Sequence, residues 1–265
     1  MTITRRASQC RQPAWERSAV DPAQVSVVLP TFNEAGNIVP LMRGILEALG
    51  PRVEIIVVDD DSPDGTSDLA REFAGSHSQV RLITRKGEKG LTTAIARGIA
   101  ESGREVVVWM DCDLSMPPAV IPDLLAALEG RDMTLGSRYA RGGLDQGHGW
   151  LGRTLSRTIC YGARTLLGGT VLDLTSGFMA ARRPLLLELG LKGDYGEYCI
   201  ELIHRAQRRG YLLAEVPYVC APRHSGESKT SVGLSGFLRR GPGYLATVGA
   251  LFLGRLRGSA SCRRA

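Results

Sequence analysis

The stretch VSVVLPTFNE, residues 25–34, decides the fold class of this chain. It joins a short apolar run to a polar cluster, and the same design recurs in EIIVVDDDSPDGT, residues 54–66, and in VVVWMDCDLSMPP, residues 106–118. Uninterrupted apolar runs of this length are typical of strands buried on both faces of a parallel sheet. Ligands bind such sheets at the carboxyl ends of the strands, so the polar clusters are the first places to look for function.

Strands and helices alternate along the chain from residue 25 to about residue 137. Apolar spacing predicts strands at residues 25–29, 54–58, 80–84, 105–110 and 133–136, and helices at residues 37–49, 67–74, 91–102 and 119–128. This alternation predicts an α/β fold with a Rossmann-like, mostly parallel sheet that is flanked by helices.

Length and composition fit a folded globular protein. The chain has 265 residues, of which 43% are hydrophobic and 23% charged, and this balance excludes a disordered chain or a repeat fibre. No stretch reaches the roughly 18 apolar residues of a spanning helix. Residues 1–24 contain Arg5 and Arg6 but no apolar run, which predicts no secretory signal. The six cysteines form no Cys-x-x-Cys pair, which argues against a zinc ribbon or a disulfide framework. We therefore expect a cytoplasmic protein.

The net charge of +6 is concentrated near the C-terminus. Residues 222–265 contain eight Lys and Arg residues and one acid, Glu227. Between the arginines lies an uncharged segment, residues 241–254, which is too short to span a membrane but suits the surface of an anionic one. A buried terminal helix or an oligomer contact is the alternative. No nucleic-acid-binding motif accompanies the charge, so we expect no nucleic acid partner.

The strand ends are unusually acidic. No dinucleotide-binding or P-loop glycine motif appears there, which argues against a dehydrogenase or a P-loop NTPase. Carboxylates repel phosphates unless a divalent cation stands between them. Asp111 and Asp113 point to the same side of an extended segment, so they could share one ion. The alternative for an isolated Asp-x-Asp is a polar turn.

The motifs together resemble a known family. PTFNE, DDDSPDGT, GLTTAIARG, DCDLSMPP, GSRY, DLTSGF and RHSGESK occur in the order and approximate spacing of the dolichol- or polyprenol-phosphate mannose synthases, which are inverting family 2 glycosyltransferases of the GT-A fold. The resemblance covers roughly residues 25–230, which we take as the glycosyltransferase domain. Residues 1–24 are predicted to be a flexible basic extension, and residues 231–265 a basic and apolar tail with a helix at the membrane interface.

The resemblance implies roles for single residues on the donor side. The nucleotide-sugar would be bound by Pro30, Phe32, Glu34, Asp59, Asp111, Cys112, Asp113, Arg223 and Lys229, with Cys112 contributing its backbone. Asp111, Asp113 and Ser115 would hold Mg²⁺ or Mn²⁺. Asp60 and Asp61 are predicted to be solvated or to cap a helix, and the Asp64 segment is predicted to be a turn with an N-cap.

The acceptor side is implied in the same way. Arg138, Arg153 and Ser156 would contact the acceptor phosphate, and the catalytic set would be Asp113, Arg138, Arg223 and Lys229. Two features carry no assigned chemistry. The histidines, His148 among them, are isolated in the sequence and are expected in surface or core roles. The Gly-rich residues 140–150 are either a mobile acceptor loop or an ordinary linker.

These expectations define a reaction. A phosphate monoester has a second pKa of about 6 and needs no strong base, so the lipid phosphate could attack the anomeric carbon directly and invert it. We expect transfer of mannose from GDP-mannose to a polyprenyl phosphate, with Mg²⁺ or Mn²⁺, at the inner face of the membrane. A membrane-protein partner is compatible with this expectation. Alternatives are a sister enzyme using another donor such as UDP-glucose, or another acceptor, and a nucleotide-sugar-binding protein without catalysis.

Overall fold

The computed structural model describes residues 20–225 and 234–262, with side chains given outside residues 234–240 and 256–262. Lys229 and most of the RHSGESK motif therefore lie outside the described residues. The predicted N-terminal extension lies outside them as well, apart from its last five residues.

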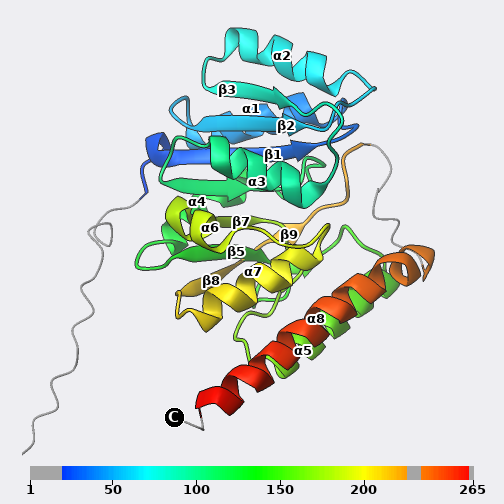
Figure 1. Ribbon diagram of the computed structural model, residues 1–265. Coiled ribbons are helices and arrows are strands. Elements are labelled where there is room, and N and C mark those ends of the chain that lie inside the picture. Colours follow the sequence, from blue (N-terminus) through cyan, green and yellow to red (C-terminus); the bar gives the residue numbers. More distant parts are fainter. Residues whose placement is uncertain (1–19, 226–233, 263–265) are drawn as a thin grey trace, which may run out of the picture.

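A seven-stranded sheet in the order β3-β2-β1-β4-β7-β5-β8 forms the centre of the protein (Figure 1). Strand β7 runs antiparallel to both of its neighbours, and every other pairing is parallel. The prediction of a mostly parallel sheet is confirmed. The bounds of the strands are Val25–Thr31 (β1), Glu54–Asp59 (β2), Val80–Thr84 (β3), Val106–Trp109 (β4), Met133–Ser137 (β5), Met179–Arg182 (β7) and Leu213–Pro217 (β8).

Helices cover both faces of this sheet and bury a separate hydrophobic cluster on each. Helices α1, α2 and α4 pack on one face, and α3, α6 and α7 on the other. All four predicted helices and all five predicted strands are confirmed. The helices span Ile38–Leu49 (α1), Thr66–Ser76 (α2), Leu91–Glu101 (α3), Ile121–Ala127 (α4), Trp150–Leu167 (α5), Arg183–Leu189 (α6), Glu197–Arg208 (α7) and Leu234–Cys262 (α8).

One glycine of the GLTTAIARG motif has a packing role. A Cβ atom at Gly98 in α3 would collide with the side chain of Val28 in β1. The glycine therefore lets α3 approach the central strand closely, and this contact holds the helix over the middle of the sheet.

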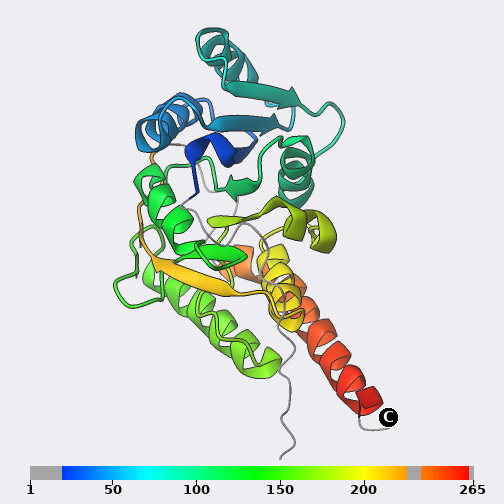
Figure 2. The same ribbon diagram turned by 90° about the vertical axis from the view of Figure 1, so that its left-hand side faces the viewer.

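The uncharged segment of the tail lies within α8, which packs against α5 and α7 (Figure 2). Val248 is buried there, and Tyr244 and Leu251 are partly buried in the same cluster. Leu245 and Leu253 remain exposed on the helix, at 70% and 54%. The helix thus combines a buried face with exposed apolar side chains. Within the described residues, no helix is both long enough and apolar enough to cross a membrane.

A small second sheet ties the Gly-rich connection to the segment that precedes Arg223. Strand β6, Leu144–Asp145, pairs in parallel with β9, Val219–Cys220. The connection is therefore hydrogen-bonded to the domain at its middle. The sequence did not predict this pairing, because two-residue strands carry no periodic signal.

Candidate functional site

Three loops follow β1, β2 and β4 at the carboxyl edge of the sheet, and each holds one strained residue. Asn33 (φ 55°), Asp61 (φ 55°) and Leu114 (φ 62°) are the non-glycine residues with positive φ in the described parts of the chain. Such backbone conformations cost of order 1–3 kcal/mol and persist only where the surrounding structure enforces them. The strain is thus confined to the edge where the sequence places the site.

Hydrogen bonds join the loop after β1 to the loop after β2. The amide of Glu34 donates to Oγ1 of Thr66 at 2.9 Å, and the amide of Ala35 donates to Oδ2 of Asp64 at 3.0 Å. Oδ1 of Asp64 accepts from the amide of Thr66. Burial of Asp64 acts to raise its pKa, but the hydrogen bonds from Thr66 and Ala35 lower this pKa overall. The predicted turn with an N-cap is confirmed, and Gly65 is the N-cap of α2.

Asp59 ends β2 and is fully buried. Its carboxylate accepts hydrogen bonds from Thr31 at 2.9 Å, from the amide and hydroxyl of Ser62, and from Ser67 at 2.7 Å. The structure gives this carboxylate a set of donors within the chain. A contact with the nucleotide stays a prediction.

Asp60 has a different environment from the one expected. It is buried and forms an ion pair with Arg85 at 2.5 Å, and it accepts a hydrogen bond from the amide of Gly90 at 2.8 Å. The expectation of a solvated or helix-capping residue is wrong for Asp60. A buried carboxylate needs a charged partner, and Arg85 at the end of β3 supplies it.

Arg223 joins the loop after β1 to the Asp-x-Asp loop. Its guanidinium lies 3.3 Å from Oε1 of Glu34 and 2.9 Å from Oδ2 of Asp113. Glu34 also accepts from the side-chain amide of Asn37 at 2.7 Å, and the amide of His224 donates to the carbonyl of Asp113 at 3.1 Å. Residues far apart in the sequence therefore meet in one charged cluster, as the motifs predicted.

The carboxyl group of Asp111 carries the clearest electrostatic signal of the site. Burial raises its pKa to about 7, and the negative charges of Asp113 and Glu34 act in the same direction. The guanidinium of Arg223 acts against them. A buried carboxyl group beside a second carboxyl group forms a site that gains from a bound cation.

The donor set fits Mg²⁺ or Mn²⁺. Asp111 and Asp113 offer hard oxygen ligands, and Asp113 is held in place by the amide of Ser115 at 3.0 Å. Metal binding by Asp111, Asp113 and Ser115 stays a prediction. Cys112 is buried in the core between the two acids, so its side chain is part of the packing.

Aromatic and cationic side chains meet beside the nucleotide-side loops. Phe32 is half-buried, and the ammonium of Lys89 lies 4.7 Å from the centre of its ring. Pro30 lies in β1 opposite Val58 of β2. Lys89 therefore lies beside Phe32, one of the residues predicted to bind the nucleotide-sugar, and the sequence analysis gave this lysine no role.

Arg138 is bound on several sides by its own chain. Its guanidinium makes two hydrogen bonds of 2.8 Å to the fully buried Asp173 and one of 2.8 Å to Thr175, and it lies 3.4 Å from Asp145. A bidentate pair of this kind fixes the plane of the guanidinium. Its contact with an acceptor phosphate stays a prediction.

The other two predicted acceptor residues lie around the same network. Arg153 donates to the carbonyl of Asp145 at 3.0 Å, and the hydroxyls of Ser156 and Thr175 are 3.0 Å apart. The structure therefore brings Arg138, Arg153 and Ser156 together through shared partners. Asp145 and Thr175 received no role from the sequence, since Asp145 lies in none of the motifs and DLTSGF, which contains Thr175, was given no residue role.

Comparison with known proteins identifies the family. Residues 26–190 match the model of glycosyl transferase family 2. The polyprenol monophosphomannose synthase of Mycolicibacterium smegmatis is 38% identical over 225 residues, which cover 80% of this chain and 84% of that protein. The undecaprenyl-phosphate mannosyltransferase of Micrococcus luteus is 34% identical, over 80% of this chain and 90% of that protein.

A similar fold is found in glucosyl-3-phosphoglycerate synthase from Mycobacterium tuberculosis, solved with Mn²⁺, UDP-glucose and phosphoglyceric acid. The TM-score is 0.65 at 25% identity, over 88% of this chain and 82% of that one. The predicted GT-A architecture is confirmed by this likeness. Since the family model covers more than half of the sequence, the chain belongs to glycosyl transferase family 2 and is a glycosyltransferase.

Proposed function

We propose that this protein transfers mannose from GDP-mannose to a polyprenyl phosphate, in a metal-dependent reaction that inverts the anomeric carbon. The cluster of Asp111, Asp113 and Glu34 around Arg223 carries the proposal, because it gathers acids and a cation at one sheet edge. The names of the relatives from M. smegmatis and M. luteus support the lipid acceptor and the sugar.

The donor side neutralises the leaving group. A divalent cation held by Asp111 and Asp113 would supply a Lewis acid for the diphosphate. Arg223, already fixed between Glu34 and Asp113, adds a second positive charge within reach of that group. Phe32 offers an aromatic surface on which a nucleotide base can stack. Together these residues hold the anomeric carbon in one position while the diphosphate departs.

The acceptor side orients the attacking phosphate. Arg153 and Ser156 lie beside the fixed guanidinium of Arg138, so we place the lipid phosphate against this group of donors. A dianionic phosphate oxygen attacks the anomeric carbon from the face opposite the diphosphate, and no proton has to be removed first. One displacement of this kind turns the α-linked donor into a β-linked product.

The membrane side of the domain is assigned to α5 and α8, which lie side by side (Figure 2). Five apolar side chains on these helices are each at least 45% exposed: Trp150, Tyr161, Leu166, Leu245 and Leu253. Exposed aromatic and aliphatic side chains near basic residues suit peripheral binding to an anionic bilayer. We place the enzyme at the inner face of the membrane for this reason.

A second candidate function differs from the first in its sugar donor. The similarity to a synthase solved with UDP-glucose favours testing that donor. Purified full-length chain would receive polyprenyl phosphate and Mn²⁺, with labelled GDP-mannose and labelled UDP-glucose in parallel, and the organic-extractable label would be counted.

Label moving only from GDP-mannose is the expected result. Label only from UDP-glucose would overturn the donor while keeping the mechanism. No transfer from either donor in the presence of membranes from the source cells, which would supply any partner, would overturn the proposal.

A further inference from the structure

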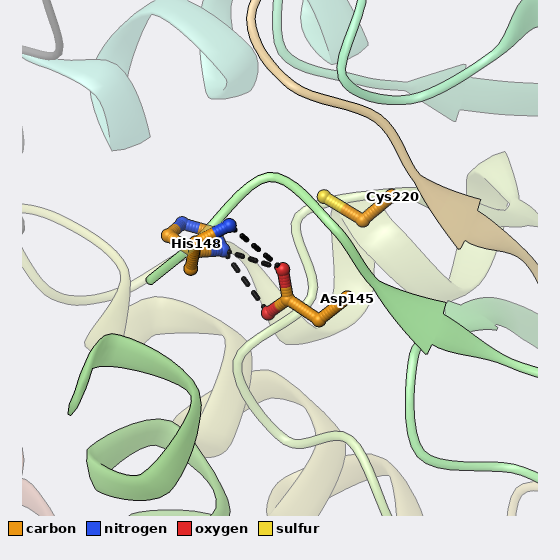
Figure 3. A group of neighbouring side chains, drawn as sticks. All are labelled: Asp145, His148 and Cys220. Atoms are coloured by element: carbon orange, nitrogen blue, oxygen red, sulfur yellow. Dashed lines mark hydrogen bonds and ion pairs between the residues drawn. The ribbon is translucent and has the colours of Figure 1, made fainter. Parts of the chain in front are cut away.

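Three side chains outside the donor site gather at the two-stranded sheet (Figure 3). Asp145 ends β6, His148 follows three residues later, and Cys220 ends β9. One potential ligand atom from each lies within 4.8 Å of the other two. They come from two segments 72 or more residues apart in sequence, so the fold and not local sequence brings them together.

We propose that Asp145, His148 and Cys220 form a metal site of the zinc type, separate from the Asp111 and Asp113 pair. Carboxylate, imidazole and thiolate are the three ligand classes that zinc accepts, and a thiolate disfavours Mg²⁺. Bonds of about 2.0–2.3 Å in a tetrahedron place neighbouring ligand atoms roughly 3.5 Å apart, so small side-chain movements would close the site.

Two of the ligands are already held in place. The side chain of Asp145 is 1% exposed and accepts hydrogen bonds from the amide of His148 at 3.1 Å and from its ring Nδ1 at 2.9 Å. Burial acts to raise the pKa of Asp145, but the hydrogen bond and charge of His148 lower it overall. Positioned ligands reduce the entropy that metal binding must overcome.

The hydrogen bond from Nδ1 of His148 to Asp145 gives way to the metal when that nitrogen binds it, and the thiol of Cys220 must lose a proton. Burial, together with the charge of Asp145, raises the pKa of the Cys220 thiol to about 11. A bound zinc ion deprotonates a coordinating thiol outright, so the cation replaces the proton. The side chain of His148 is 34% exposed, so solvent and a metal ion can reach the group from its side.

Such a site would connect the acceptor network to the donor loop. Asp145 also lies 3.4 Å from Arg138, and the residue after Cys220, Ala221, donates its amide to the carbonyl of Ser115 at 2.9 Å. A metal ion here would fix the Gly-rich connection to β9. It would also compete with Arg138 for the Asp145 carboxylate.

Cobalt is the probe for this site, because Co²⁺ replaces zinc and shows a sulfur-to-metal charge-transfer band only when a thiolate binds it. Full-length protein would be titrated with Co²⁺ alone and then with Zn²⁺. We expect a band that appears with Co²⁺, disappears with Zn²⁺, and is lost in Cys220→Ser. The matched control is Cys112→Ser, which removes the thiol between Asp111 and Asp113 and should keep the band.

A second variant protects the test against misfolding. His148→Ala changes a partly exposed loop residue and should weaken Co²⁺ binding at least about tenfold, since even outer-shell partners contribute 10–100-fold to metal affinity. The proposal is overturned if the wild-type protein gives no band, if the band survives Cys220→Ser, or if His148→Ala binds Co²⁺ as tightly as the wild type.

Discussion

The proposed donor and acceptor halves of this site are built in opposite ways. On the proposed donor side, short loops after β1, β2 and β4 carry the acids, and burial raises the pKa of Asp111 to about 7, with the charges of Asp113 and Glu34 acting in the same direction. On the acceptor side, Arg138 and the buried Asp173 satisfy one another within 2.8 Å. The proposed donor side gathers three acids around Arg223, whereas on the proposed acceptor side Arg138 is held by a bidentate pair with a buried acid.

Because of this difference, we expect substitutions on one side to affect mainly activity and substitutions on the other to affect mainly folding stability. Removing an acid from the donor cluster relieves repulsion and removes a ligand site, so activity should fall without a loss of folding. Removing Arg138 leaves Asp173 buried without its counter-charge, so folding should suffer. Variants on the two sides therefore distinguish the two halves directly.

The largest effect is expected from Asp113→Ala on the donor side. Transfer should fall about a thousandfold or more, because a metal ion contributes several kcal/mol to stabilising transition-state charge. The rate of label transfer into lipid measures it. Asp61→Asn, an exposed acid in the loop after β2, serves as the control and should keep the wild-type rate. Full activity in Asp113→Ala would contradict the assignment of Asp113 as a metal ligand.

The next effect concerns the stability of the acceptor side. Arg138→Met should lower the free energy of unfolding by about 3–5 kcal/mol, because it leaves a buried carboxylate unpaired. Denaturant titration measures this value. The double variant Arg138→Met with Asp173→Leu removes both charges and should recover part of the loss. A single variant as stable as the wild type would show that the pair does not support the fold.

A smaller effect is expected at Phe32, in the predicted nucleotide-binding site. Phe32→Ala should weaken GDP binding by roughly tenfold, since stacking of a base on an aromatic ring is worth about 1–3 kcal/mol. Calorimetry of GDP binding measures the change. Phe32→Tyr keeps the ring and should bind GDP as the wild type does. If Phe32→Ala binds GDP as tightly as Phe32→Tyr does, Phe32 is not part of the nucleotide-binding site.

The smallest effect lies at the membrane side. Leu245→Ser should weaken binding to anionic vesicles by about fivefold, since partial burial of one leucine contributes roughly 1 kcal/mol. Co-sedimentation with vesicles measures it. Leu187→Ser changes a leucine that is 51% exposed on α6 and serves as the control. Equal binding by the two variants would place the membrane contact elsewhere.

The sequence predicted where the acids of the proposed donor side lie in the sheet for a physical reason. Each acid there follows a continuous apolar strand, so a local pattern places it at the sheet edge, as Asp59, Asp111 and Asp113 demonstrate. Parallel strands then bring these edges together without further information.

The acceptor half depends on contacts between distant segments. Strand β7 enters the sheet antiparallel between β4 and β5, and β6 pairs with β9 over two residues. Neither event leaves a periodic signal in the sequence. The partners of Arg138 and the meeting of His148 with Cys220 follow from those pairings, so residue patterns alone could not reveal them.

The most direct test of this account is the linkage formed from GDP-mannose labelled at the anomeric carbon. Full-length protein would be given the donor, polyprenyl phosphate and Mn²⁺, and the lipid fraction would be examined by nuclear magnetic resonance. We predict mannosyl phosphate on the lipid with the β configuration, the product of a single displacement. An α linkage, or label that never reaches the lipid, would contradict it.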